Sequence, residues 1–365
     1  MITREYGHTG KSVSVIGFGG MRFKDVGDRD ACIAMMVEAA EGGITYFDTA
    51  PAYFGTASET IFGEGFRELD RRGLPCFCAT KTSKSTEKDI RAEIEGQLKR
   101  LGRSAIDFYH VWCITSLRSW RQRKSHGVIG AFRALKREGL VRHICVSSHL
   151  IGEEIRELLM EDLFEGVLFG YSAYNFNARQ KAFEAIAARG IGCVVMNPLG
   201  GGIIPQNPGI FDFIRTRRDE TVVEAALRFL LSHERITCAL VGFSTVEQVR
   251  EAVRAVDRFS PIPGAEIERM KKRLGAAFAD LCTGCQYCDS CPERIPIPKL
   301  MDAYNHKKLY GTDKALLERL AWHWSVKPEQ AAKCTECGRC EELCTQHLPI
   351  ISRMADIARL GGGKG

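Results

Sequence analysis

Short apolar segments of strand length alternate with amphipathic helical segments along most of the sequence, and this alternation constrains the fold more than any other feature. Eight strand candidates occur between residues 11 and 256 of the 365-residue chain. They are residues 13–19, 45–49, 76–81, 106–112, 143–147, 166–174, 192–197 and 237–243. Such alternation is typical of an α/β protein with a parallel sheet, and eight units can close into a (β/α)₈ TIM barrel.

Helical segments lie between these strands, and several end at a glycine, as helices commonly do. They include residues 30–41, 87–101, 128–138, 179–189 and, after the last strand, 246–255, with Gly42, Gly102, Gly139 and Gly190 as the terminating glycines. The alternative fold is an open, doubly wound sheet. Such a sheet usually carries G-x-G-x-x-G after its first strand, and residues 17–22 lack the third glycine.

Cysteines divide the chain unevenly. Seven of the fifteen are dispersed singly through the strand and helix pattern, where we expect core residues: Cys32, Cys76, Cys78, Cys113, Cys145, Cys193 and Cys238. The other eight follow residue 280 in two tight groups. A turn-rich break at 259–264 and a basic helical segment at 266–278 precede them. We therefore expect a barrel at 1–262, a linker helix at 263–280 and a cysteine domain at 281–365.

Composition argues against several classes of protein. The first residues lack the apolar segment of a signal peptide, and no apolar stretch approaches the ~18 residues needed to span a bilayer. We therefore expect a cytoplasmic protein without a membrane partner. The net charge is only +6, and its bases are scattered beside acids. The basic runs at 118–124 and 215–218 fit solvated loops or an anion-steering rim, so we expect no nucleic-acid partner.

Three chemically suitable side chains stand at or just beyond consecutive predicted strand ends. Asp48 ends the second strand, Tyr53 follows it, and Lys81 ends the third. In such barrels chemistry sits where the strands end. A free tyrosine has a pKa near ~10, and a neighbouring ammonium lowers it. The pattern predicts a tyrosine proton donor beside a lysine that an aspartate holds in place.

Several segments resemble the aldo-keto reductase family and follow its order over residues 3–256. They are REYGHTGKSVSVIGFGGMR at 4–22, YFDTAPAY, ATK, GLVRHICVSSH, MNPLGGG and VGFSTVEQVREAV. The resemblance implies an oxidoreductase that uses NAD(P)H on a small carbonyl or alcohol substrate. It also implies a catalytic tetrad of Asp, Tyr, Lys and His, whose first three positions match Asp48, Tyr53 and Lys81.

The fourth tetrad position departs from the family. The family histidine falls at Trp112, whereas the histidine of this strand is His110. Two residues are separated by about 6–7 Å along a strand. Either His110 acts from deeper in the barrel, or it is a structural histidine and Trp112 shapes the substrate pocket.

The cofactor positions implied by the resemblance also depart in part. At the carboxamide of the nicotinamide ring they are Ser147, Ser148 and Tyr171. Met196 stands where a tyrosine usually stacks on the nicotinamide. Near the phosphates of the dinucleotide they are Gly200, Gly201, Ser244, Thr245 and Gln248. The usual lysine and arginine that bind a 2′-phosphate correspond to Phe243 and Gln248, with Arg250 or Arg254 as substitutes. Glycine loops and helix N-termini can still bind phosphates through backbone N–H groups. The choice between NADH and NADPH stays open.

The two cysteine groups resemble the ligand runs of two-cluster ferredoxins. Cys282, Cys285, Cys288 and Cys291 form C-x₂-C-x₂-C-x₂-C, and Cys334, Cys337, Cys340 and Cys344 form C-x₂-C-x₂-C-x₃-C. In bacterial ferredoxins the fourth cysteine of each run binds the other cluster. This crossing predicts one 4Fe–4S cluster on Cys282, Cys285, Cys288 and Cys344, and a second on Cys334, Cys337, Cys340 and Cys291. Zinc is the alternative, but its sites favour two C-x₂-C knuckles separated by a longer loop.

The 42 residues between the runs carry helical rather than strand patterns, notably at 314–324, which is similar to the tail of a bacterial and archaeal branch of aldo-keto reductases. The clusters would transfer electrons, with a ferredoxin-like protein as a candidate partner, sense redox state or stabilise the tail. A nicotinamide moves two electrons as hydride, whereas a cluster moves one, and nothing in the sequence indicates a flavin between them. The alternatives are a non-catalytic electron carrier or redox-sensing protein with a vestigial barrel, and an enzyme that uses another small redox partner in the same pocket.

Overall fold

The structure is a computed structural model that describes residues 1–365 except 175, 275–277, 279 and 362–365, with the backbone alone at 177 and 178. The chain divides into two compact units. One comprises Met1–Leu199 with Ile214–Glu266, and the other Gly200–Phe213 with Ile267–Gly365. The second unit therefore includes a short segment from within the barrel sequence.

The first unit is a closed barrel of parallel strands, which confirms the predicted fold class. Neighbouring strands pair in chain order, and the last closes on the first. The strands are β3 (Ile16–Gly19), β4 (Tyr46–Asp48), β5 (Phe77–Thr82), β6 (Ile106–Ile114), β7 (Val141–Ser148), β8 (Gly166–Gly170), β9 (Gly192–Met196) and β10 (Cys238–Gly242).

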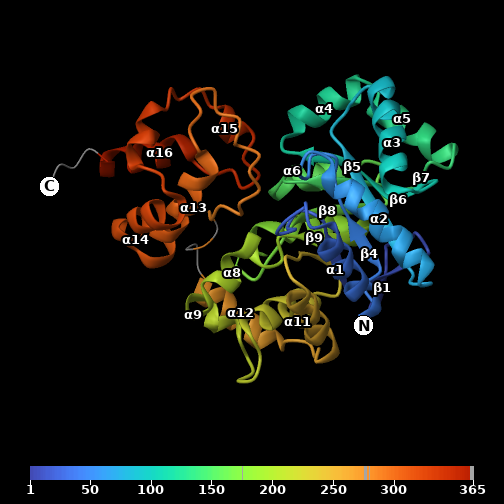
Figure 1. The fold of residues 1–365 in the computed structure, drawn as a ribbon, viewed down its shortest axis with the longest axis horizontal. Coiled ribbons are helices and arrows are strands. Elements are labelled where there is room, and N and C mark those ends of the chain that lie inside the picture. Colours follow the sequence, from blue (N-terminus) through green and yellow to red (C-terminus); the bar gives the residue numbers. More distant parts are fainter. Residues whose placement is uncertain (175, 275–277, 279, 362–365) are drawn as a thin grey trace. The chain divides into compact units, whose positions relative to one another are not determined.

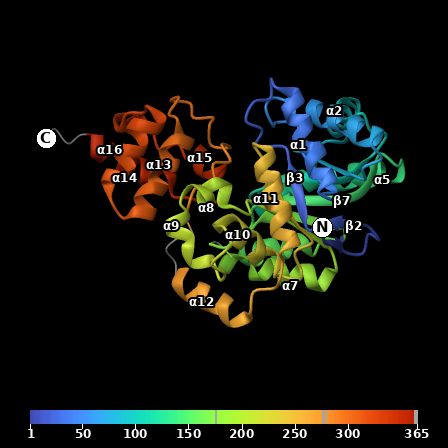
Figure 2. The same cartoon turned by 60° about the horizontal axis from the view of Figure 1, so that its bottom comes forward.

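Helices surround these strands (Figures 1 and 2). They are α1 (Arg29–Glu41), α2 (Ala57–Arg71), α3 (Glu87–Leu101), α4 (Leu117–Ser125), α5 (Val128–Arg137), α6 (Gly152–Leu159), α7 (Gln180–Arg189), α10 (Val222–Leu231) and α11 (Val246–Asp257). Gly102 and Gly190 end α3 and α7 in the left-handed conformation, as predicted. Gly42 caps α1, whereas Gly139 lies one residue beyond the cap of α5.

The prediction of one continuous first strand at 13–19 is wrong. The chain instead forms an antiparallel hairpin of β1 (Thr3–Glu5) and β2 (Ser12–Ser14) before it enters the barrel at Ile16. Tyr6 and Val13 of this hairpin belong to the buried core inside the barrel. The hairpin therefore closes the end of the barrel opposite the carboxyl ends of the strands.

Side chains that alternate along the strands fill the barrel interior in layers. Tyr6, Tyr46 and Phe108 form an aromatic layer in which Tyr6 lies 4.2 Å from Phe108 between ring centroids. Two residues further along the strands, Asp48 and Lys81 point to the same interior, and Lys81 pairs in register with His110. The polar layer thus lies nearer the carboxyl ends of the strands.

The second unit is helical, which confirms the predicted class of the cysteine domain. It contains α8 (Ile203–Gln206), α9 (Pro208–Phe211), most of α12 (Gly264–Leu274), α13 (Ile297–Tyr310), α14 (Asp313–Glu318), a π-helical turn (Arg319–Trp324), α15 (Arg339–Glu342) and α16 (Ile350–Gly361). Its core includes Leu300, Leu316 and Ile357 together with three of the cysteines. The predicted helix at 266–278 reaches Leu274, and 275–277 lie outside the described residues.

No helix in the described part of the chain combines the length and the apolar character that crossing a membrane requires.

Candidate active site and cluster ligands

Asp48 and Lys81 form a buried ion pair at the carboxyl ends of β4 and β5. Each side chain is 1% exposed, and Lys81 Nζ donates to Asp48 Oδ1 and, at 2.7 Å, to the carbonyl oxygen of Thr49. Burial raises the pKa of Asp48 and lowers that of Lys81, and the opposite charge of each partner limits both shifts. The structure therefore brings the two predicted residues together as a fixed pair.

Tyr53 lies beside this pair in the loop between β4 and α2. Lys81 Nζ is 5.4 Å from the centroid of its ring. Its backbone is held by a turn, since Tyr53 N–H donates to Ala50 O at 3.1 Å and Ser58 N–H donates to Tyr53 O at 3.3 Å. An ammonium, a carboxylate and a phenol thus meet at the carboxyl end of the barrel, where the sequence predicted them.

His110 and Trp112 both point into the barrel but have different neighbours. His110 Nδ1 lies 3.3 Å from Thr80 O, and because a carbonyl only accepts, Nδ1 carries the hydrogen. Burial and the Lys81 charge lower the pKa of His110 to about 3, so the ring is neutral. Trp112 meets the Tyr53 ring edge to face, with centroids 5.9 Å apart. This geometry favours Trp112 as the residue that borders the proton donor.

A β-bulge that the sequence did not reveal shapes the end of β6. The pairing of β6 with β7 shifts register between Val111 and Ile114, and Cys113 adopts a φ of 60°. Arg123 of α4 donates from Nη1 to Trp112 O at 2.6 Å. Bulges often aim side chains near active sites, and this one sets the direction of Trp112. Cys113 and Cys76 are half-buried, whereas the other five dispersed cysteines are buried as predicted.

The residues predicted to contact the nicotinamide carboxamide do not all lie on the same side of the barrel wall. Ser147, the next-to-last residue of β7, is 1% exposed, and Met196 ends β9 in register with Gly170. Ser148 instead lies toward β6, with Oγ 3.5 Å from Ile114 O. Tyr171 packs against Phe183 of α7 and Phe229 of α10, with centroids 5.1 and 6.1 Å away. The Tyr171 ring therefore faces the helices rather than the interior, and its predicted cofactor contact does not fit.

Two donor groups that sequence reasoning missed lie near the same rim. Arg179 is 4% exposed, and its Nη1 donates to Leu150 O at 2.7 Å. A side chain at Gly170 would have its Cβ 3.6 Å from Arg179 Nη2 and 4.0 Å from Asn197 Nδ2. The glycine thus leaves a notch bordered by a guanidinium and an amide. The signal in the sequence was an arginine close after a strand end.

The N-terminus of α11 gathers the predicted phosphate contacts. Thr245 caps the helix by accepting from Gln248 N–H at 3.4 Å, while the Gln248 side chain accepts from Ser244 N–H at 2.8 Å. Ser244 Oγ donates to Arg22 O at 2.7 Å, so Arg22, which sequence reasoning passed over, lies at this helix end. Arg250 bonds Glu38 at 2.7 Å from Nε.

Gly200 and Gly201 follow β9, but both belong to the second unit. With Gly202 they have φ angles of 64°, 69° and 105°, which favour glycine. A Cβ at Gly201 would lie 2.8 Å from the carbonyl carbon of Thr283 and closer still to its oxygen. Gly201 therefore allows close backbone contact with the first cysteine run, a role the sequence did not suggest.

Four cysteines form one group around the first run. Cys285 Sγ lies 3.4 Å from the hydroxyl oxygen of Thr345, the residue that follows Cys344. Burial raises the pKa of Cys288, and the nearby Cys282, Cys285 and Cys344 raise it further. Gly284 N–H lies 3.4 Å from Cys282 Sγ, and Leu348 N–H lies 3.3 Å from Cys344 Sγ. N–H donors of this kind stabilise thiolates. Cys344 therefore lies near the first run, and the crossed ligand assignment stays a prediction.

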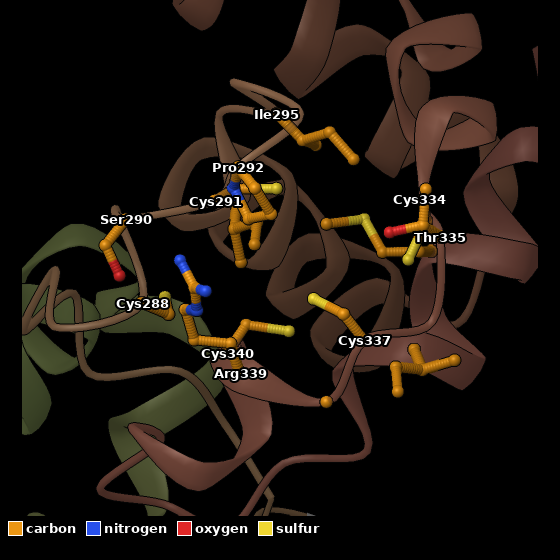
Figure 3. A pocket seen from close by; sticks show the side chains of 14 residues that line it. Cys288, Ser290, Cys291, Pro292, Ile295, Cys334, Thr335, Cys337, Arg339 and Cys340 are labelled. Atoms are coloured by element: carbon orange, nitrogen blue, oxygen red, sulfur yellow. The ribbon is translucent and has the colours of Figure 1, made fainter.

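The remaining four cysteines line one cavity: Cys291, Cys334, Cys337 and Cys340 (Figure 3). The same cavity also includes Cys288, so the two groups are neighbours. Zinc with bonds of ~2.3 Å would need thiolates within about 4 Å of one another. Among the described residues, no three histidine, cysteine or acidic side chains converge closely enough to hold one metal ion. In a cluster each thiolate binds its own iron, so its ligands need not converge on one ion.

Two family models match the chain in succession. The model of the aldo/keto reductase family matches residues 15–274, and that of a 4Fe–4S dicluster domain matches residues 281–348. The first covers the barrel and the ion pair, and the second covers all eight clustered cysteines.

Relatives of known sequence match over most of their length. The chain is 29% identical over 283 residues to L-galactose dehydrogenase of Arabidopsis thaliana, covering 69% of this chain and 87% of that protein. It is 24% identical over 290 residues to the NADH-specific methylglyoxal reductase of Escherichia coli, covering 66% and 86%. Among solved structures, the holo form of aldo-keto reductase AKR11C1 from Bacillus halodurans matches with a TM-score of 0.65 and 25% identity, covering 74% of this chain and 96% of that one.

Proposed function

The chain belongs to the aldo/keto reductase family, and we propose that its barrel reduces a small carbonyl compound, or oxidises the corresponding alcohol, with a nicotinamide dinucleotide. The family match and the oxidoreductases among its relatives make it an NAD(P)-dependent oxidoreductase. The observation that carries the proposal is the buried Asp48–Lys81 pair beside the ring of Tyr53.

Each residue of this group has a separate task in the proposed reaction. Tyr53 gives its hydroxyl proton to the carbonyl oxygen, and the Lys81 ammonium stabilises the phenolate that remains. Asp48 holds Lys81 in place and balances its charge. A bound nicotinamide supplies or accepts the hydride. Trp112 borders the substrate beside Tyr53, and neutral His110 is a buried structural residue below them.

The rim offers groups that fit a dinucleotide. Gly170 leaves a notch beside the donors of Arg179 and Asn197, while Ser147 and Met196 lie at or next to the ends of the neighbouring strands. Arg22 and the N-terminus of α11 suit phosphates, since a helix N-terminus attracts anions. These contacts replace that of Tyr171, whose ring faces the helices, and they leave the choice between NADH and NADPH undecided.

We also propose that the second unit holds two 4Fe–4S clusters with crossed ligands. Cluster I takes Cys282, Cys285, Cys288 and Cys344, and cluster II takes Cys334, Cys337, Cys340 and Cys291. Cys337 is exposed, so cluster II is the one suited to exchange electrons with a ferredoxin-like partner. We propose the domain boundaries that the sequence predicts, with a barrel at 1–262, a linker at 263–280 and the cluster domain at 281–365.

The proton-donor assignment is tested with Tyr53→Phe in anaerobically purified protein. We expect carbonyl reduction to fall by about 10²–10⁴-fold, the usual worth of a general acid, because the ring remains but its proton is gone. Iron content and nucleotide affinity, measured by nucleotide fluorescence, should match the wild type. Full turnover in the variant would refute the role of Tyr53, and a wild-type protein that binds neither NADH nor NADPH would refute the proposed reaction.

A further inference from the structure

The loop after β9 belongs to the unit that contains the cluster ligands, although the barrel precedes and follows it in sequence. Gly200–Phe213 groups with the second unit, although Leu199 before it and Ile214 after it belong to the first. Within the second unit, Tyr310 at the end of α13 donates from its hydroxyl to Asn207 Oδ1 at 3.0 Å. Phe211 packs against Phe278 with ring centroids 5.7 Å apart. The loop is thus attached along its length.

Its closest attachment is to the ligand loop of cluster I. Thr283 stands between the ligands Cys282 and Cys285 and is 2% exposed. Its carbonyl occupies the place where a Cβ of residue 201 would lie, so only glycine at 201 permits the contact. The φ of 69° at Gly201 imposes the same restriction independently.

The ligand loop itself is held in place by buried contacts and by its thiolates. Asn305 is 2% exposed and bonds Cys282 on both sides, donating to its carbonyl and accepting from its N–H, each at 2.8 Å. Residues 281–296 contain neither helix nor strand. The path of these residues therefore depends on such anchors and on the bonds from their cysteines to iron.

We propose that cluster I positions the loop after β9 through the contact of Thr283 with Gly201, and thereby sets the affinity of the barrel for its dinucleotide. The inference rests on the proposed function. Gly201 lies five residues beyond Met196 at the end of β9, so a displaced ligand loop moves a segment continuous with the nicotinamide side of the rim. This coupling requires no electron transfer between cluster and nucleotide, so the mismatch between one-electron and two-electron carriers does not bear on it.

The first test changes the contact and leaves every cysteine in place. In Gly201→Ala the methyl group must push the Thr283 carbonyl away, and we expect NADPH and NADH to bind about tenfold more weakly, with an altered electron paramagnetic resonance signal of cluster I. Gly209→Ala is the matched control. It lies in the same loop, but its φ is not positive and a Cβ there would meet nothing within 4 Å. It should retain wild-type binding and signals.

The second test changes the clusters and leaves the loop intact. Cys344→Ala removes a ligand of cluster I, and Cys337→Ala removes one of cluster II. We expect the first variant to lose about tenfold in nucleotide affinity and the second to stay within twofold of the wild type, with iron content reporting the loss of cluster in each.

These outcomes separate the inference from its alternatives. Weaker nucleotide binding in Gly201→Ala with an unchanged cluster I signal would show that Gly201 contacts the phosphates directly, and would overturn the inference. Equal affinities in Cys344→Ala and Cys337→Ala would overturn it as well. A wild-type protein with full iron content that binds no nucleotide would instead refute the proposed function.

Discussion

The barrel and the cluster unit hold their reactive groups in different ways. Asp48, Lys81 and His110 come from three different strands, and the hydrogen-bonded ladder of the closed barrel fixes their heights. The first run of cluster ligands instead lies on chain without helix or strand. Cys334 follows a 3₁₀ helix (Pro328–Lys333), and Cys337 lies between it and the short helix α15. Backbone pairing defines the first site, whereas the bonds to iron must define much of the second.

The difference extends to how each site satisfies its charges. In the barrel a carboxylate and an ammonium neutralise each other without any bound group. Among the cysteines burial has the largest effect, and it raises the pKa of Cys282 to about 12 and that of Cys340 to about 11. Iron is what makes these thiols favourable as thiolates. The barrel site should therefore persist without cofactor, while the cluster unit should not persist without metal.

Removal of iron is the strongest test of this contrast. After chelation under reducing, anaerobic conditions we expect amide hydrogens at 281–348 and in the loop at 200–213 to lose their protection from exchange, because metal binding supplies much of the folding free energy there. Strands β3 to β10 should keep theirs. Hydrogen exchange with mass spectrometry measures both at once. Equal loss in the two units, or no loss at 281–348, would contradict the contrast.

Breaking the buried pair should show the complementary effect in the barrel. Asp48→Asn leaves the Lys81 charge uncompensated, and such removal of one partner of a buried pair costs about 3–5 kcal/mol in the free energy of unfolding. Denaturant unfolding of the barrel measures the loss, with iron content unchanged. Glu138→Gln is the control, because the pair of Glu138 with Arg91 lies at the surface, where solvent screens its charges, and its loss should cost far less than that of the buried pair. Equal losses of unfolding free energy in the two variants would contradict the stabilising role of the buried Asp48–Lys81 pair.

The sequence predicted the features of both units that local patterns encode. Alternating apolar segments and terminal glycines such as Gly102 specify the barrel, since each strand and helix shows its own periodicity. The position of Lys81 beside Asp48 followed because carboxyl ends of parallel strands share one edge. The spacing of Cys282, Cys285 and Cys288 likewise indicated cluster ligands. In each case neighbours in sequence carry the information.

The features that escaped prediction depend on register and on packing between distant segments. The bulge at Cys113 needs the β7 ladder and the bond from Arg123 to Trp112 O, and neither is visible in a strand pattern. The outward direction of Tyr171 needs the register that turns Leu168 of β8 toward the interior, because side chains alternate along a strand. The role of Gly201 depends on Thr283, which lies more than eighty residues away. A glycine in sequence shows where a side chain is missing, but not what occupies its place.

The smallest expected effect concerns His110, which lies in the polar layer of the barrel interior. His110 has a pKa of about 3 in the folded protein because burial and the nearby Lys81 charge disfavour its protonated form, while an unfolded histidine has a pKa of ~6.5. Between these values the unfolded state binds more protons, so the stability of the barrel falls as the pH falls. The loss amounts to about 1.4 kcal/mol between pH 7.5 and pH 5.5. The free energy of unfolding of the His110→Asn variant should fall correspondingly less over that pH interval, as measured by denaturant unfolding of the barrel. Parallel curves for the two proteins would show that His110 is not held neutral, and would reopen its part in catalysis.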